Sequence, residues 1–172
     1  MFGAVESSVN TSQWGTSVRG NNGSRNIIRN NSIGGREGSG TGSGPRNAII
    51  LAGNSSGDGT EDNLIQDNYI SNIYMVAINM EGADGTTIDG NEITNPDVTN
   101  PPSWGSAAIN MDNSNAITSK ETNITKNRIH HQYGTSSSGG AVYYGIWGRD
   151  VGNGDMNINN NTIYDVKVTS EV

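Results

Sequence analysis

The sequence predicts an all-β solenoid of about five to six rungs. Two short motifs alternate along the chain, and residues that favour sharp turns are abundant. The chain has 172 residues, of which 24 are glycine and 25 are asparagine. Both residue types suit tight turns and left-handed backbone positions, so many corners are expected. The length fits a single domain.

The first motif, Ile-x-x-Asn-x-Ile, occurs five times. An isoleucine and the residue two places further on share one face of a strand. We assign the face that carries the isoleucines to the interior. One rung cannot bury that face alone, whereas stacked rungs form a continuous internal column. The copies begin at Ile28, Ile65, Ile88, Ile124 and Ile158, so successive starts are 37, 23, 36 and 34 residues apart.

The asparagine of the motif falls at the same place in every rung, directly before a turn. Stacked amides hydrogen-bond to one another and to backbone groups of the turn. We therefore expect an asparagine ladder at one corner of the solenoid, formed by Asn31, Asn68, Asn91, Asn127 and Asn161.

The second motif is a small residue followed by isoleucine and usually by a large apolar residue two places later. It predicts another inward-facing strand in each rung. A fragment is visible at Val18, which precedes Ile28 by ten residues. The complete copies lie at 48–51, 77–80, 108–111 and 145–147.

Residues 15–172 are assigned to the solenoid, and residues 1–14 to an irregular segment or partial rung. The turn from Ile65 to Ile88 is close to the minimum length, so the longer turns must carry their extra residues as loops. Insertions on one face of a solenoid often mark the binding face. The predicted loops that follow the first motif are 34–47, 94–107 and 130–144, and those that precede it are 52–63, 112–123 and 148–157.

The repeat resembles that of right-handed parallel β-helix proteins with pectate-lyase-like (PbH1) repeats. This group includes pectate lyases, other polysaccharide lyases, polygalacturonases, alginate epimerases and phage tailspikes. The resemblance covers residues 15–168 and implies the fold, but the repeat is structural and identifies no activity. The polygalacturonase signatures Asn-Thr-Asp, Asp-Asp, Gly-His-Gly and Arg-Ile-Lys do not occur in the sequence. An enzyme of this group would be a polysaccharide lyase or a glycoside hydrolase.

Composition narrows the possible partners. A disordered chain would match the low hydrophobic content of 31%, but the regular recurrence of isoleucine argues against it. The net charge of −7 and the scattered cations argue against nucleic acid. No apolar run approaches the roughly 20 residues of a membrane-spanning helix. The chain has no cysteine and shows no signal peptide. The resemblance implies an extracellular, cell-surface or virion location.

Aromatic and hydrogen-bonding residues that follow the first motif form the candidate polysaccharide-binding surface. Sugar rings present both C–H and O–H groups, which suit aromatic faces beside polar side chains. Two alternatives are open, namely that Trp104 pins its own loop and that Trp147 packs under a neighbouring loop. The candidate residues are Trp104, Arg128, His130, His131, Tyr133, Tyr143, Tyr144 and Trp147.

His130 and His131 are adjacent, so alternation along a strand predicts that they face opposite sides. A general base, a metal ligand and a plain surface histidine are all open roles for them. Arg128 and Lys126 are expected to point outward, and the sequence shows no carboxylate partner for either.

An acidic stretch suggests a calcium site, because Ca²⁺ prefers several oxygen ligands. Its candidate ligands are Asp58, Glu61 and Asp62. In β-helix lyases calcium neutralises a uronate carboxylate, which the resemblance would extend to this chain. The alternative is that these residues fill turns for conformational reasons.

Two functions from different classes follow. One is an extracellular or phage-borne module that engages polysaccharide, by binding rather than by turnover. The other is a non-catalytic structural solenoid, a stalk, sheath or fibre subunit. The sequence shows no capping helix at either end, and two explanations are open: the chain is a piece of a longer β-helix, or copies stack end to end on the open rungs. Association as a trimer is also open.

Overall fold

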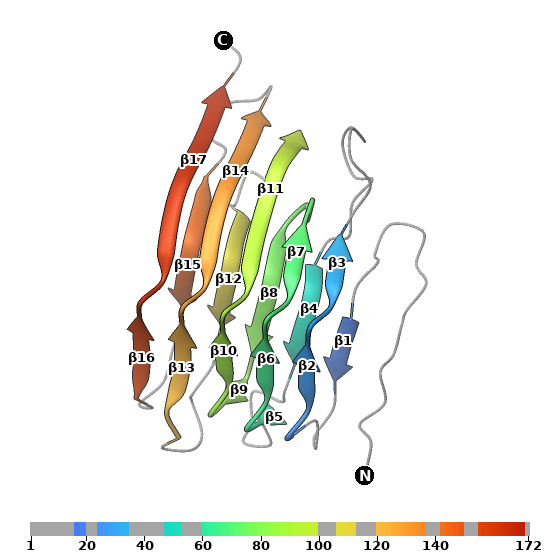
Figure 1. Ribbon diagram of the computed structural model, residues 1–172, viewed down its shortest axis with the longest axis vertical. Helices are drawn as coiled ribbons and strands as arrows, with labels where there is room; N and C mark the ends of the chain where they lie inside the picture. Colours follow the sequence, from blue (N-terminus) through green and yellow to red (C-terminus); the bar gives the residue numbers. More distant parts are fainter. Residues whose placement is uncertain are drawn as a thin grey trace.

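The computed structural model describes residues 16–19, 24–34, 47–52, 60–99, 106–112, 120–136, 142–149 and 155–170. These residues form a parallel β-solenoid of five rungs, as the sequence predicts (Figure 1). Each rung adds one strand to each of three five-stranded sheets, and every pairing between neighbouring rungs is parallel. The described part of the chain contains no helical segment of the length and hydrophobicity that a lipid bilayer requires.

Sheet 1 holds the strands of the second motif. Ile49, Ile78, Ile109 and Ile146 are aligned across successive rungs of this sheet. Its strands are β1 (Thr16–Arg19), β4 (Asn47–Ala52), β8 (Val76–Glu81), β12 (Ser106–Asp112) and β15 (Tyr143–Arg149).

Sheet 2 holds the first isoleucine of the Ile-x-x-Asn-x-Ile motif. Ile65, Ile88 and Ile124 are aligned in it and fully buried. Its strands are β2 (Ile27–Arg29), β6 (Leu64–Gln66), β10 (Thr87–Asp89), β13 (Thr122–Thr125) and β16 (Met156–Asn159).

Sheet 3 holds the second isoleucine of the motif. Ile70, Ile93 and Ile129 are aligned and fully buried. Its strands are β3 (Ser32–Gly34), β7 (Tyr69–Ser71), β11 (Glu92–Thr99), β14 (Arg128–Ser136) and β17 (Thr162–Ser170). A short two-stranded sheet, β5 (Thr60–Glu61) with β9 (Ala83–Asp84), lies between sheets 1 and 2 along the chain.

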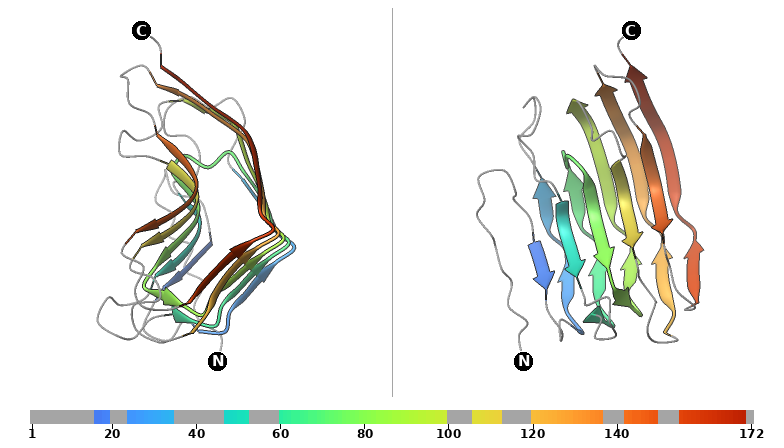
Figure 2. Two further views of the ribbon diagram at one scale, coloured as in Figure 1. Left: turned by 90° about the vertical axis from the view of Figure 1, so that its left-hand side faces the viewer. Right: turned by 180° about the vertical axis from the view of Figure 1, so that it is seen from behind.

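The three sheets enclose the hydrophobic core. Sheets 2 and 3 meet at a sharp corner, and sheet 1 lies opposite that corner (Figure 2, left). The isoleucine columns of all three sheets belong to one buried cluster. The predicted internal column is therefore confirmed.

The asparagine ladder stands at the corner between sheets 2 and 3. The Asn68 amide nitrogen donates to Oδ1 of Asn91 at 2.9 Å, and Asn91 donates to Asn127 at 3.0 Å. The amides of Asn68, Asn91, Asn127 and Asn161 also donate to a backbone carbonyl of the preceding rung, as Asn91 does to Ile65 at 3.0 Å. Asn31 and Asn161 continue the ladder in the outer rungs. The predicted ladder is confirmed, and it satisfies groups that the corner buries.

The residue before each ladder asparagine is left-handed. A positive φ turns the chain within one residue, and Gly, Asn and Asp adopt it most readily. The five positions are Asn30, Asp67, Gly90, Lys126 and Asn160, with φ values of 57°, 51°, 66°, 56° and 55°.

The small residue of the second motif faces the interior. A Cβ built on Gly145 would lie 2.7 Å from Cδ1 of Ile163, a residue of sheet 3. Ala48, Ala77 and Ala108 hold the same place in the other rungs and are fully buried. The motif requires a small residue there because sheet 3 closes in from the opposite side.

Two of the predicted loops begin too early. Strand β11 continues to Thr99 and strand β14 continues to Ser136, so much of 94–107 and 130–144 belongs to sheet 3. Parallel pairing between β14 and β17 extends through Ser136 and Ser170, and these backbone hydrogen bonds keep the segment in the sheet.

Candidate functional site

Seven side chains gather on the outer face of sheet 3 over the third to fifth rungs. They come from β11, β14 and β17, which are neighbours in the sheet. We call them the histidine–tyrosine cluster, and its members are Glu92, Arg128, His130, His131, Tyr133, Tyr164 and Asp165.

Strand register builds the cluster. Glu92 of β11 pairs with Arg128 of β14, and His130 of β14 pairs with Tyr164 of β17. Each pair stands on adjacent strands, about 4.8 Å apart. Residues 36 or 34 positions apart in the sequence are thereby placed in contact.

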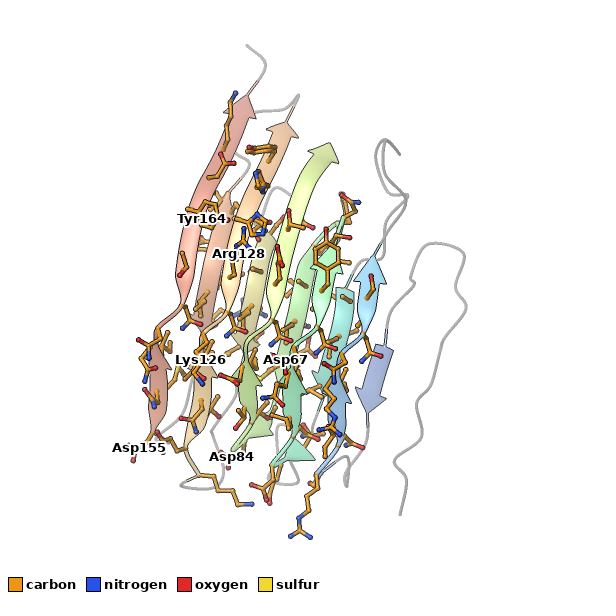
Figure 3. The ribbon with its side chains drawn as sticks, viewed as in Figure 1. Asp67, Asp84, Lys126, Arg128, Asp155 and Tyr164 are labelled. Carbon is orange, nitrogen blue, oxygen red and sulfur yellow. The ribbon has the colours of Figure 1, made fainter. Side chains whose placement is uncertain are left out.

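Tyr164 is the aromatic centre of the cluster. Its ring stacks on His130, with centroids 5.2 Å apart and an angle of 8° between the rings. Arg128 donates to the Tyr164 hydroxyl from Nε at 2.9 Å and from Nη2 at 2.7 Å (Figure 3). Tyr164 as a whole residue is 38% exposed. Tyr164 is therefore accessible on the outer face of sheet 3, and His130 and Arg128 fix its orientation.

The two histidines lie on the same side of the sheet, so the expectation of opposite faces is wrong. His131 has a φ of 48°, and it is an extra residue between two positions of β14 that pair with consecutive residues of β11. This β-bulge interrupts the alternation of side chains. The ring centroids are 4.6 Å apart, and Nδ1 of His130 contacts Nδ1 of His131.

Carboxylates hold the outer nitrogens of both rings. Nε2 of His130 lies 2.8 Å from Oε1 of Glu92, and Nε2 of His131 lies 3.3 Å from Oδ2 of Asp165. The Tyr133 hydroxyl also donates to that Asp165 oxygen, at 2.5 Å. All four ring nitrogens thus have partners within the cluster.

The cluster alters the ionisation of two of its members. The hydrogen bond to the Tyr164 hydroxyl is the main cause that raises the pKa of Arg128. The hydrogen bond to Asp165 raises the pKa of Tyr133, because it stabilises the neutral phenol. Both groups therefore remain hydrogen-bond donors across the neutral pH range.

A second aromatic group lies on sheet 1. The rings of Tyr144 and Trp147 stack with centroids 4.7 Å apart, and the Arg149 guanidinium lies 5.7 Å from the Trp147 centroid. Arg149 also bonds to Asp112 of the preceding rung. Two neighbours thus lie against the Trp147 ring, and Trp147 is partly buried whereas Tyr164 is exposed.

The remaining predicted binding residues lie elsewhere. Tyr143 packs against the hydrophobic core, its buried hydroxyl has no hydrogen-bond partner among the described residues, and burial raises its pKa well above the usual value. Trp104 lies outside the described residues. The sequence therefore grouped residues that the structure places on two different sheets.

The predicted calcium ligands Glu61 and Asp62 converge on a cation, but that cation is Lys120. Its Nζ lies 2.8 Å from Oε2 of Glu61 and 2.8 Å from Oδ2 of Asp62. Hydrogen bonds to Asp62 and then Glu61 raise the pKa of Lys120. Asp58 lies outside the described residues. Across the described ranges no three His, Cys, Asp or Glu side chains form a metal-binding group.

Arg128 and Lys126 do have carboxylate partners, which the sequence did not reveal. Nη1 of Arg128 lies 3.6 Å from Glu92, and Nζ of Lys126 lies 3.6 Å from Asp89. Both partners belong to the preceding rung. Asp89 also accepts from Thr125 at 2.7 Å, and this hydrogen bond is the main cause that lowers the pKa of Asp89.

Sequence reasoning missed Glu92, Tyr164 and Asp165. Aligning the five repeats on their asparagines would have placed Glu92 beside Arg128 and Tyr164 beside His130. The same alignment brings Asp165 level with His131, and both have a positive φ. The register of the repeat would therefore have identified these contacts, had it been extended to the residues that flank the second isoleucine of each motif.

Comparison of the chain with protein-family models, with curated proteins and with solved structures gave no match. The parallel solenoid and its asparagine ladder therefore stand on the structure alone.

Proposed function

We propose that this protein engages polysaccharide through the histidine–tyrosine cluster on sheet 3, by binding rather than by turnover. The resemblance of its repeat to right-handed, pectate-lyase-like β-helix proteins supports the ligand class. That resemblance also implies action outside the cell or on a virion, and we carry this location as part of the proposal.

The observation that carries the proposal is the arrangement of the cluster along the solenoid axis. Rings, donors and acceptors follow one another across three successive rungs on one outer face. Rungs about 4.8 Å apart form a straight row, which suits an extended polymer. Tyr164 offers an apolar ring, and Arg128 offers charged donors beside it.

We propose binding and not catalysis because of the contacts that the two histidine rings make. General acid–base catalysis needs a nitrogen or oxygen directed at the substrate proton. His130 and His131 direct all their ring nitrogens at Glu92, Asp165 and each other. The cluster thus lacks a free acid–base group on its rings.

Affinity electrophoresis tests the proposal, with pectate, xylan and a neutral glucan each cast into the gel. We expect at least one polysaccharide to retard the wild-type chain. Arg128→Ala removes the charged donors and Tyr164→Ala removes the aromatic ring, so each should weaken that binding about tenfold or more. Their melting temperatures should change little, because both side chains are more than one third exposed.

Arg29→Ala is the matched control. Arg29 is an exposed arginine of β2, on sheet 2 and in the first rung, far from the cluster along the axis. Its loss should leave retardation unchanged. Equal binding by Arg128→Ala, Tyr164→Ala and the wild type would remove the cluster from the binding surface.

The fifth rung favours a second candidate, a structural solenoid that associates through its end. Ile158 and Ile163 are 46% and 47% exposed, whereas Ile124 and Ile129 at the same places in the fourth rung are fully buried. A second copy that stacks on this rung would bury them. Light scattering should then give the wild type a mass above the 18.1 kDa of one chain. The variant Ile163→Lys should have the mass of a single chain. A wild-type mass of one chain at every concentration would exclude this candidate.

A further inference from the structure

The contact between the two histidine rings is not explained by polysaccharide binding. The chain has two histidines in all, and their Nδ1 atoms meet at the bulge of β14. Polar atoms in such contact need a hydrogen or a cation between them.

The neighbouring carboxylates fix the hydrogen on each ring. A carboxylate accepts hydrogen bonds, so the nitrogens that face Glu92 and Asp165 carry hydrogen. In a neutral imidazole the other nitrogen then presents a lone pair. When both rings are neutral, the two Nδ1 atoms direct lone pairs at each other, an arrangement that attracts a cation.

We propose that Nδ1 of His130 and Nδ1 of His131 bind a divalent transition-metal ion of the class that prefers imidazole, such as Cu²⁺, Ni²⁺ or Zn²⁺. Metal-bound histidines almost always donate their other N–H to a carboxylate or carbonyl, which orients the ring. Glu92 and Asp165 stand in this relation to the two rings. Water completes the coordination, since within the described ranges no further protein ligand converges on the point.

The two histidines differ in exposure, and this difference determines which ring can turn to admit an ion. His130 has 7% of its side chain exposed and stacks on Tyr164, so it is the fixed ligand. His131 is 45% exposed. Ligand nitrogens lie about 2.0–2.1 Å from the metal, so the rings must move apart. The exposed His131 ring provides this movement by turning outward.

Equilibrium dialysis of the untagged wild-type chain against CuCl₂, NiCl₂ or ZnCl₂ tests the proposal. We expect one ion per chain, with Cu²⁺ bound most tightly, in line with the general affinity order for divalent metals. Electron paramagnetic resonance of the Cu²⁺ form should show coupling to imidazole nitrogen. Because the chain has two histidines, both in this site, imidazole coupling in the wild-type spectrum comes from this site alone.

His131→Ala should abolish stoichiometric binding, and Glu92→Gln should weaken it about 10- to 100-fold, the usual effect of losing an outer carboxylate partner. Asp67→Asn, which changes an exposed carboxylate at a corner away from the cluster, is the control and should bind like the wild type.

Two results would overturn the proposal. One is equal Cu²⁺ binding by the wild type and by a His130→Ala/His131→Ala double variant. The other is no saturable binding by the wild type; a nitrogen NMR spectrum that shows a hydrogen shared between the two Nδ1 atoms would then account for their contact. Neither result depends on polysaccharide, so the site stands or falls separately from the proposed function.

Discussion

Lys126 is the unusual residue among the five left-handed corner positions. The other four are Asn, Asp or Gly, which tolerate a positive φ, whereas lysine has no side-chain group that compensates for it. Its ion pair with Asp89 is 3.6 Å long, and the lysine side chain is 69% exposed. Exposed pairs of this kind contribute about 0–1 kcal/mol. The ion pair therefore offsets only part of the backbone strain at this corner, which is about 1–2 kcal/mol for a left-handed residue.

Replacing Lys126 separates the two effects. Lys126→Asn and Lys126→Ala both remove the ion pair, but only asparagine favours the left-handed conformation. We expect the asparagine variant to be about 1 kcal/mol more stable than the alanine variant. Urea unfolding of the two variants measures the difference. Equal stability would mean that the corner imposes no strain on ordinary residues.

At His131 the prediction made from the sequence, that adjacent histidines face opposite sides of the sheet, was wrong. Alternation along a strand separates adjacent residues, and only a bulge reverses that rule. The left-handed residues at the corresponding places are Asn72, His131 and Asp165, all of types that tolerate a positive φ. The backbone signal was present in the sequence, but it became readable only once the strands were in register.

Among the strands, the small residue of the second motif sets how closely sheets 1 and 3 approach. Ala77 and Ala108 are fully buried in the core. A Cβ added at Gly145 would collide with the side chain of Ile163. The sequence showed that the position is small. It could not show why, because the facing strand lies elsewhere in the chain and its distance is a property of the packed sheets.

Ala108→Leu should therefore destabilise the solenoid. Inserting a larger side chain into a packed core costs about 1–3 kcal/mol. Ala52→Leu makes the same chemical change on β4, at a position that pairs with the exposed Glu81, and should cost less than about 0.5 kcal/mol. Chemical denaturation compares the two variants. Similar losses in both would show that sheet 3 does not limit the size of this column.

For the molecule as a whole, the periodic residues predicted the architecture and the intervening residues did not. The five asparagines and their isoleucines set the number of rungs, because each must stack on its equivalent to be buried. Strand ends and surface contacts depend on register and on long-range pairing. The extension of β14 to Ser136 could for that reason not be predicted from local patterns, whereas the pairing of Glu92 with Arg128 required the repeats to be aligned on their asparagines.

The alignment of unequal turns has a consequence for how such a chain tolerates insertions and deletions. The turn from Ile65 to Ile88 has 23 residues and the next has 36, yet all three isoleucines pair in one register. Each turn advances the axis by about 4.8 Å whatever its length. Residues gained or lost in the connecting loops therefore change the outline of the protein and leave the spacing of its surface columns untouched. The loops can therefore differ in length and sequence while the distance between neighbouring strands stays the same.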